Sequence, residues 1–343
     1  MPNFFVHVGA HKTGTCAFQK WLQLNRPRLF DAGLIAPHLG GDRLGNYRPF
    51  MEALAGPTNL TQRTQKRIIK SLLKEVKRSP NHDVIISSEY FFNPKFENHR
   101  EEFSEQLKSI GHNRFAILIV RDQYTWVNSI YCQRRQTLFD VPDTLEAYVA
   151  QMIRNNRGNW ANTAEEIDKL GFDLTTLPYT REFQAAGIVK NIMSIPALAG
   201  RVAVSIEEST LRENESMGAT GLIIADQVKA RALEIAPELT PNVRKELGKI
   251  VRTFVADRGL NDPKFNGLSP AVREMIASGY NDSNARFAKR YLEQSWCDLF
   301  PLNEHFGELS PRRIEDLDHR DAAIVKEICD EVLHRANELK LFN

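Results

Sequence analysis

Cysteine is scarce in this chain of 343 residues, and long apolar runs are absent. The four cysteines, Cys16, Cys132, Cys297 and Cys329, lie far apart and form neither a Cys-x-x-Cys pair nor a Cys/His metal pattern. At this density a disulfide framework is not expected, which indicates reduced thiols in a reducing compartment. The longest clean apolar stretch is Phe115–Val120, far short of the roughly 18 residues that span a bilayer. The chain also begins without a basic and then apolar leader, so we expect a cytoplasmic protein without a transmembrane segment.

An excess of charge of either sign is missing as well. The chain has 45 Lys and Arg against 43 Asp and Glu, and its formal net charge is +2. This balance creates no strong overall field for nucleic acid or for an anionic membrane, so a nucleic-acid partner is not expected. Any anionic ligand must therefore be held by a local cluster of bases. With 42% hydrophobic and 26% charged residues, the composition is that of a globular protein with a buried core.

Short apolar runs alternate with helical patterns in the first half of the chain. Strands are expected over residues 4–8, 83–87 and 115–120, and helices over 17–25, 68–76 and 97–110 and from about residue 122. Residues 31–57 are rich in Gly and Pro and are expected to be irregular. Strands that alternate with helices favour an α/β fold with a parallel sheet that is covered on both faces. In such a sheet, ligands bind beyond the carboxyl ends of the strands.

The second half is mainly helical. Apolar stripes at residues 145–153 and 222–233 predict two helices, while residues 175–179 and 202–206 are candidates for further strands. The sequence has no internal repeat and no linker-like stretch. We therefore expect a single domain over residues 1–343, with a parallel-sheet core in 1–210 and a helical part in 211–343.

A glycine-bounded loop connects the first expected strand to the first expected helix. Gly9 and Gly14 have the spacing of a P-loop, whose backbone N–H groups hold phosphate at a helix N-terminus. A P-loop continues with Lys and then Ser or Thr, whereas Thr15 and Cys16 follow here and the lysine lies inside the loop, at Lys12. This displacement disfavours a Mg²⁺-triphosphate and indicates a phosphate loop of another type. Alternatively, the two glycines only shape a turn and leave Lys12 in solvent.

A second anion site is indicated where the strand at 115–120 ends. Arg121 follows this strand directly, and Ser129 comes about two turns into the expected helix. The two side chains can then converge on one phosphate, because Arg offers planar, bidentate donors and Ser offers a hydroxyl. Alternatively, Arg121 and Asp122 only cap the helix and Ser129 fills space.

Together the two motifs resemble the family of sulfotransferases that use 3′-phosphoadenosine-5′-phosphosulfate (PAPS), and its bacterial members in particular. The resemblance rests on residues 7–15 (HVGAHKTGT) and 121–131 (RDQYTWVNSIY), and it covers residues 4–135. Beyond them it is looser, although Arg212–Ser216 and Ser283-Asn284 are similar to late elements of bacterial members. The resemblance implies a P-loop-like fold and transfer of a sulfuryl group from PAPS to a hydroxyl or amine acceptor, without a metal. Such an acceptor would be a glycan, a lipid or a small metabolite.

The resemblance also implies roles for single residues. The loop would bind the 5′-phosphosulfate through His11, Lys12, Thr13, Gly14, Thr15 and Cys16. Cys16 departs from the family pattern, in which Ser or Thr supplies one more hydroxyl. Arg121 and Ser129 would bind the 3′-phosphate that distinguishes PAPS from ATP, and Tyr179 and Arg212 are further candidates for contacts with the nucleotide. Lys12 would also neutralise the leaving phosphate during transfer.

Sulfuryl transfer requires a base that takes the proton of the acceptor. Glu89, which follows the strand at 83–87, is the first candidate because family members place residues near the acceptor at this level of the sheet. Alternatively, Glu89 is an exposed loop acid or an ion-pair partner. His11 is the rival base, whereas His7 alternates into a strand and is expected to be buried rather than catalytic.

Two other functions are compatible with the residues. A small-molecule kinase or NTPase would use the same fold, but the displaced lysine and the lack of an obvious Mg²⁺-binding acid disfavour it. A non-catalytic nucleotide-binding protein would bind 3′-phosphoadenosine 5′-phosphate (PAP), the product of transfer, without moving sulfate. The acceptor and the oligomeric state do not follow from the sequence.

Overall fold

The computed structural model of this chain describes residues 2–38, 47, 61–89, 91, 101, 104–105, 107–108, 113–205, 217–260, 263–302 and 307–342. The chain divides into two compact units, each assembled from separate segments. Unit 1 contains residues 1–122, 159–213 and 282–301, and unit 2 contains residues 123–158, 214–281 and 302–343.

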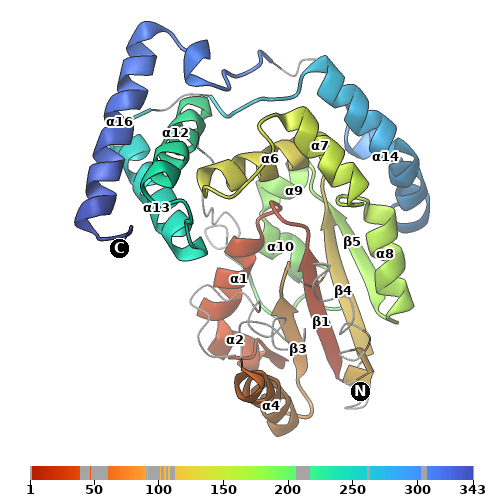
Figure 1. Ribbon diagram of the computed structural model, residues 1–343. Coiled ribbons are helices and arrows are strands. Elements are labelled where there is room, and N and C mark those ends of the chain that lie inside the picture. The colour runs from red at the N-terminus through yellow and green to blue at the C-terminus, as the bar shows by residue number, and fades with distance from the viewer. Residues whose placement is uncertain are drawn as a thin grey trace. The chain divides into compact units, whose positions relative to one another are not determined.

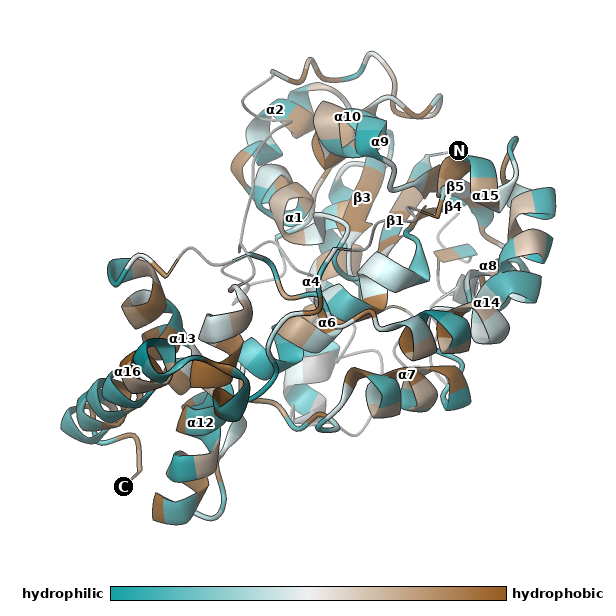
Figure 2. Cartoon of the chain, turned by 90° about the horizontal axis from the view of Figure 1, so that it is seen from above, coloured by the Kyte–Doolittle hydropathy of each residue, from teal (hydrophilic) through white to brown (hydrophobic). Residues whose placement is uncertain are grey.

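Unit 1 is built on a five-stranded, entirely parallel sheet with the strand order β2-β3-β1-β4-β5 (Figure 1). The strands are β1 (Asn3–Gly9), β2 (Leu34–Ile35), β3 (Asp83–Ser87), β4 (Asn113–Val120) and β5 (Asp173–Pro178). Because β1 and β3 are buried almost throughout, their sequences are continuous apolar runs, and both are coloured mostly as hydrophobic in Figure 2. The α/β class and the parallel sheet expected from the sequence are thus confirmed.

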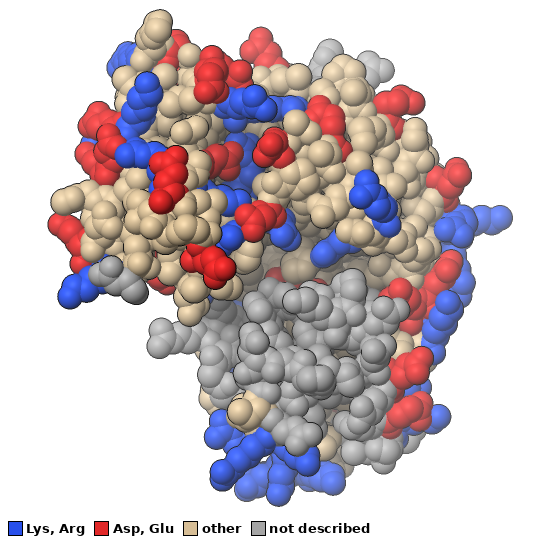
Figure 3. Space-filling model, viewed as in Figure 1, with Lys and Arg blue, Asp and Glu red and all other residues tan. Residues whose placement is uncertain are grey.

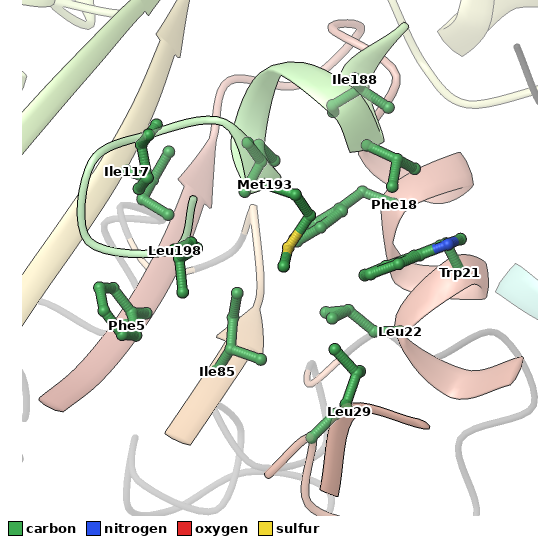
Figure 4. Packing of buried hydrophobic residues seen from close by; sticks show 14 of the residues in the cluster. Phe5, Phe18, Trp21, Leu22, Leu29, Ile85, Ile117, Ile188, Met193 and Leu198 are labelled. Atoms are coloured by element: carbon green, nitrogen blue, oxygen red, sulfur yellow. The ribbon is translucent and has the colours of Figure 1, made fainter. Parts of the chain in front are cut away.

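One face of this sheet packs against four helices of unit 1. The helices are α1 (Thr15–Leu24), α2 (Arg26–Asp31), α9 (Arg181–Ala186) and α10 (Ile188–Met193). Between them and the sheet lies a cluster in which Phe18 and Trp21 of α1 are fully buried against strand residues such as Phe5 and Ile85 (Figure 4). Each such side chain contributes roughly 1.5–3 kcal/mol by leaving water. This packing fixes α1, and therefore the loop that precedes it, relative to the sheet.

The opposite face of the sheet is covered by α8 (Trp160–Lys169), which contacts β4 and β5. Asn159 caps α8, because its side-chain oxygen accepts from the N–H of Asn162 at 3.1 Å. The end of α14 (Pro270–Tyr291) is joined to the same face: the hydroxyl of Thr176 in β5 donates to the carbonyl of Tyr291 at 2.6 Å. The hydroxyl of Tyr291 in turn donates to Asp168 of α8 at 2.6 Å. The expected two-sided cover of the sheet is therefore present.

The remaining elements of unit 1 test the sequence-based boundaries. The expected helix around residues 68–76 is longer and forms α4 (Gln62–Arg78), and a short helix, α15 (Trp296–Leu299), follows α14. The strand expected at 202–206 is wrong for residues 202–205, which form no strand, and residue 206 lies outside the described residues. Val202 and Val204 pack against the apolar cluster instead, so their alternation reflects burial without a hydrogen-bonded neighbour strand. Most of the helix expected at 97–110, and most of the irregular stretch at 31–57 apart from β2, lie outside the described residues.

The part of unit 2 that the structure describes is helical. It contains α6 (Gln123–Gln136), α7 (Leu145–Arg154), α12 (Ala219–Ile235), α13 (Pro241–Asp257), the short 3₁₀ helix η2 (Ile314–Asp316), α16 (His319–Glu338) and the first part of α14. α12 packs on α6, α13 and α16, and its buried face includes Leu222 and Val228, as the apolar stripe predicts. The guanidinium of Arg135 is buried and pairs with Asp226 at 2.6 Å, which joins α6 to α12.

Candidate functional site

Four polar segments follow four neighbouring strands at the carboxyl edge of the sheet. The loop at residues 10–14 follows β1, Glu89 comes shortly after β3, Arg121 follows β4 and Tyr179 follows β5. In Figure 1 this is the edge at which the chain passes from β1 into α1. Because β3, β1, β4 and β5 are adjacent in that order, the four segments lie side by side, as expected for a parallel sheet.

Glycine determines the path of the loop after β1. Gly9 and Gly14 have φ angles of 101° and 89°, in the left-handed region that side chains rarely adopt. The backbone also passes close to neighbouring side chains at each position. A Cβ at Gly9 would lie 3.4 Å from the Cβ of Glu89, and a Cβ at Gly14 would lie 3.4 Å from Cγ2 of Ile188. The two glycines therefore place the loop backbone directly beside Glu89 and α10.

The N-terminus of α1 is not capped by a side chain. Gly14 occupies the N-cap position, and its carbonyl accepts from the N–H of Ala17 at 3.0 Å. The N–H groups of a first helical turn point along the helix axis and carry its partial positive charge. Here they point toward the loop, which is the arrangement that favours an anion at a helix N-terminus.

Contacts from β4 and from within the loop hold its backbone in place. The N–H of Ala10 donates to the carbonyl of Ile119 at 2.9 Å, and the hydroxyl of Thr13 donates to the carbonyl of Ala10 at 2.7 Å. Arg121 Nη1 donates to the carbonyl of Lys12 at 2.7 Å, where the backbone of Lys12 has a φ angle of 63°. The loop motif and the arginine motif, 109 residues apart, therefore meet directly.

The hydroxyls of Thr13 and Thr15 both donate to protein oxygens. Thr13 donates inside the loop, as described above, and Thr15 Oγ1 donates to a carboxylate oxygen of Glu89. Both residues are buried. A phosphate without a proton can accept but not donate, so in this conformation the contribution of these two threonines to anion binding comes from their backbone N–H groups.

Glu89 lies between the loop and α1. Besides the hydroxyl of Thr15, it faces His11, whose Nδ1 is 3.3 Å from Glu89 Oε1, and the Glu89 side chain is only 12% exposed. Burial alone would raise the pKa of this carboxyl. The hydrogen bonds from His11 and Thr15, with the charges of His11 and His7, outweigh burial and hold the pKa of Glu89 below its usual value of 4.5. Glu89 is therefore a buried, ionised partner of His11 rather than an exposed loop acid.

His7 lies beneath this site and is fully buried, as expected from its place in β1. Its Nδ1 is 2.7 Å from the hydroxyl of Ser87 in β3, and its ring packs edge-on against Phe18. Burial lowers the pKa of His7 from 6.5 to about 4, although the charge of Glu89 opposes the shift. His7 is therefore a neutral core residue at pH 7.

The buried imidazole of His7 makes folding sensitive to mild acid. Below pH 6.5 the unfolded chain binds a proton at His7 that the folded chain does not bind until about pH 4. Because the unfolded state holds more protons in this window, stability falls as pH falls, by roughly 3 kcal/mol in total. Glu89 does not contribute to this pH dependence above about pH 4.5. Because its folded-state pKa is lowered, its contribution to folding stability is lost only as the pH falls below 4.5.

We expect urea unfolding of His7→Asn to show a much smaller loss of stability between pH 6.5 and pH 4.5 than the unchanged protein. The asparagine keeps a hydrogen-bonding group near Ser87 but does not titrate. His319→Gln, at an exposed histidine at the start of α16, is the matched control and should keep the full loss. An unchanged pH dependence in His7→Asn would contradict the buried, neutral assignment.

Arg121 is held by groups on three sides. Its guanidinium carbon lies 5.3 Å from the centre of the Tyr179 ring, its Nη1 binds the Lys12 carbonyl, and its own carbonyl accepts from Trp160 Nε1 at 2.9 Å. Burial lowers the pKa of Arg121, while Asp122 and Tyr179 act in the opposite direction. An arginine keeps its charge even so, because its ordinary pKa is far above neutrality. The guanidinium of Arg121 is therefore a fixed positive charge beside the loop, and it lies over the ring of Tyr179.

The structure does not bring all of the expected site residues together. Ser129 lies half-buried on α6 in unit 2, whereas Arg121 lies near the end of the first segment of unit 1, so their convergence on one phosphate stays a prediction. Arg212 lies outside the described residues. Cys16 is partly exposed in the first turn of α1, without a disulfide bond. Phe91, which follows Glu89 by two residues, is buried against Phe172 in the core.

Two relations in the site were not predicted from the sequence. One is the contact of Thr15 and His11 with Glu89, and the other is the hydrogen bond from Arg121 to the backbone of Lys12. The sequence does indicate that these residues belong to the site, because each of them comes at or just after the end of a predicted strand or loop. Strand order decides which of these ends are neighbours, and no local pattern in the sequence encodes the order β3-β1-β4.

Comparison with protein-family models, with curated proteins and with solved structures finds no match for this chain. Among the described residues, every helix falls short of the length or the hydropathy of a membrane-spanning segment. Within the same residues, no group of three or more His, Cys, Asp and Glu side chains is arranged to hold a metal ion.

Proposed function

We propose that this chain is a sulfotransferase that moves the sulfuryl group of PAPS to a hydroxyl or amine acceptor. The observation that carries the proposal is the contact of Arg121 with the backbone of Lys12 at the carboxyl edge of the sheet. It joins the two motifs that resemble the PAPS-dependent family. PAPS carries phosphate at both ends of its ribose, so a protein that binds it needs two adjacent groups of cations and N–H donors.

The residues of unit 1 suit the two ends of such a donor. The N–H groups of the loop and of the first turn of α1, together with Lys12, would bind the 5′-phosphosulfate. Arg121, fixed against Tyr179, would bind the 3′-phosphate through its planar donors. Ser129 would add a hydroxyl to that phosphate, as in the family pattern, and Arg212 is a further proposed contact.

The chemistry is an in-line displacement that depends mainly on position and charge. Glu89 would take the proton of the acceptor as the new bond between the acceptor and sulfur forms. Lys12 would neutralise the charge that the 5′-phosphate gains as its bond to sulfur breaks. His11, 3.3 Å from Glu89, would orient the carboxylate and is the second candidate for the base.

A kinase or NTPase of the P-loop type is less well supported. In such a loop the residues at positions 15 and 16 would be a phosphate-binding lysine and a hydroxyl that holds Mg²⁺. Here the hydroxyl of Thr15 donates to Glu89, and Cys16 has no hydroxyl. The acceptor is proposed only by class, and a cytoplasmic location remains an expectation from the sequence.

Donor selectivity tests the proposal. We expect PAP to raise the melting temperature more than Mg²⁺-ATP does at the same concentration, because only PAP has phosphates for both anion sites. A ligand at about a hundred times its Kd adds roughly 2.7 kcal/mol to stability, which is a shift of several degrees for a chain of this size or smaller. Differential scanning fluorimetry with PAP, ADP and ATP, each with and without Mg²⁺, measures it.

Two outcomes would go against the proposal. An equal or larger shift with Mg²⁺-ATP favours a kinase or NTPase. Stabilisation by PAP without release of label from ³⁵S-PAPS, to water or to a panel of glycans, lipids and small alcohols, favours the non-catalytic binding protein.

A further inference from the structure

Helix α4 (Gln62–Arg78) carries a stripe of bases that the proposed activity does not use. Neighbouring bases in this stripe are one, three or four residues apart in the sequence. At 100° of rotation per residue, all of them lie within about a third of the helix circumference. Every one is exposed. The members of this basic stripe are Arg63, Lys66, Arg67, Lys70, Lys74, Lys77 and Arg78.

The charge of the basic stripe is not neutralised within the described part of the chain. None of the ion pairs between described residues includes a member of the stripe, and the single acid of α4, Glu75, accepts from the backbone N–H of His38 at 3.1 Å. Seven bases and one acid give α4 a formal charge of +6. Since the whole chain has a formal net charge of +2, the rest of it carries −4. The balanced composition therefore conceals a strongly positive ridge on a slightly acidic protein.

The opposite face of α4 is already occupied by the fold. Ile68, Leu72 and Val76 are 8%, 2% and 3% exposed and point away from the stripe. An amphipathic helix that inserts into a lipid interface uses such an apolar face. In this protein that face is buried in unit 1, so any partner of the stripe is recognised by charge alone.

We propose that the basic stripe of α4 docks the protein reversibly on an anionic phospholipid bilayer. The charges lie on an outward-facing ridge about 25 Å long, at the 1.5 Å rise per residue of an α-helix, and the Lys and Arg side chains form a patch at the lower edge of Figure 3. A flat anionic surface meets such a ridge along its whole length. The stripe has no aromatic side chain on which a nucleic-acid base could stack, which disfavours single-stranded nucleic acid.

The charge of the remaining chain also favours a surface over a polymer that wraps the protein. The formal net charge of −4 outside α4 repels a polyanion from the rest of the molecule. A bilayer, by contrast, needs to contact only the basic stripe. The attraction acts within a Debye length, about 8 Å at physiological salt, so docking should be released by salt. This inference is independent of the sulfotransferase proposal.

Co-sedimentation with vesicles tests the docking. The full chain should pellet with vesicles of phosphatidylcholine and phosphatidylserine, and not with phosphatidylcholine alone. Each Lys or Arg near an anionic surface contributes roughly a fivefold gain in affinity. Neutralising Lys66, Lys70 and Lys74 together to Gln should thus weaken binding by about 100-fold. Glutamine has a high helix propensity and keeps α4 intact.

The matched control is Lys245→Gln with Lys289→Gln and Lys326→Gln, which removes the same charge from exposed lysines on α13, α14 and α16. Binding of this control should stay within about threefold of the unchanged protein, because these charges lie outside the stripe. Equal loss in both triple variants, or no binding to phosphatidylserine vesicles at low salt, would overturn the proposal. Stripe-dependent binding to heparin or duplex DNA without binding to vesicles would replace the bilayer by a polyanion.

Discussion

Glu89→Gln should lower single-turnover sulfuryl transfer by roughly 10²- to 10⁴-fold, the usual contribution of a general base. The substitution is well matched to the site. An amide oxygen can still accept from Thr15, and the amide nitrogen can still face Nδ1 of His11, so the contacts of the carboxylate are kept while its basicity is lost. Because the pKa of Glu89 is lowered, it is a weaker base than an ordinary carboxylate. The expected loss therefore lies toward the lower end of the range.

The measurement pairs release of label from ³⁵S-PAPS with a PAP titration on the same variant. PAP affinity should hardly change, since the proposed role of Glu89 is on the acceptor side. In the unchanged protein, the acidic limb of kcat should lie below pH 4.5, because the carboxylate is ionised above that value. Near-normal transfer by Glu89→Gln would remove Glu89 as the base, and His11→Gln should then show the loss instead.

Lys12→Met should lower kcat by about 10²- to 10³-fold, the effect of removing one group that stabilises charge in a transition state. The methionine keeps an unbranched stem at a position whose backbone is already in the left-handed region, so the φ angle of 63° is no harder to adopt than before. Only the charge that is proposed to meet the leaving phosphate is removed. Single-turnover rates at saturating PAPS measure the change.

Arg121→Lys is the contrasting variant. It keeps a positive charge next to the loop but loses the planar donors that reach the Lys12 carbonyl and that stack on Tyr179. We expect weaker PAP binding, by about 10-fold or more, with a smaller change in kcat, because a 3′-phosphate held by Arg121 would be bound equally before and after transfer. A Lys12→Met variant that changed only KM would contradict the role assigned to Lys12.

Much of unit 1 was predictable because its signals are local. The apolar runs that became β1, β3 and β4 are buried on both faces, and continuous hydrophobicity is the pattern that such strands require. The alternation with helices fixed the strands as parallel, and parallel strands place their carboxyl ends at one edge. The loop, Glu89, Arg121 and Tyr179 could therefore be assigned to one edge before their contacts were known.

The misassigned strand shows where local signals fail. Val202 and Val204 alternate like strand residues, but a strand also needs a neighbour with unpaired N–H and C=O groups. These valines are instead partly buried against the apolar cluster that includes residues of α1 and α10. Periodicity therefore indicates burial, and long-range packing determines whether the buried residues belong to a sheet.

The class of the fold and the loop with its displaced lysine could be read from the sequence, which also contains the spacing of bases along α4. These properties depend on residue type and spacing along the chain. The tertiary structure decided that Arg121 holds the backbone of Lys12, that Thr15 and His11 both turn to Glu89, and that His7 is buried without charge. These contacts cross between strands and helices that are up to 109 residues apart, and strand order and side-chain packing, which no local spacing encodes, bring them within hydrogen-bond distance.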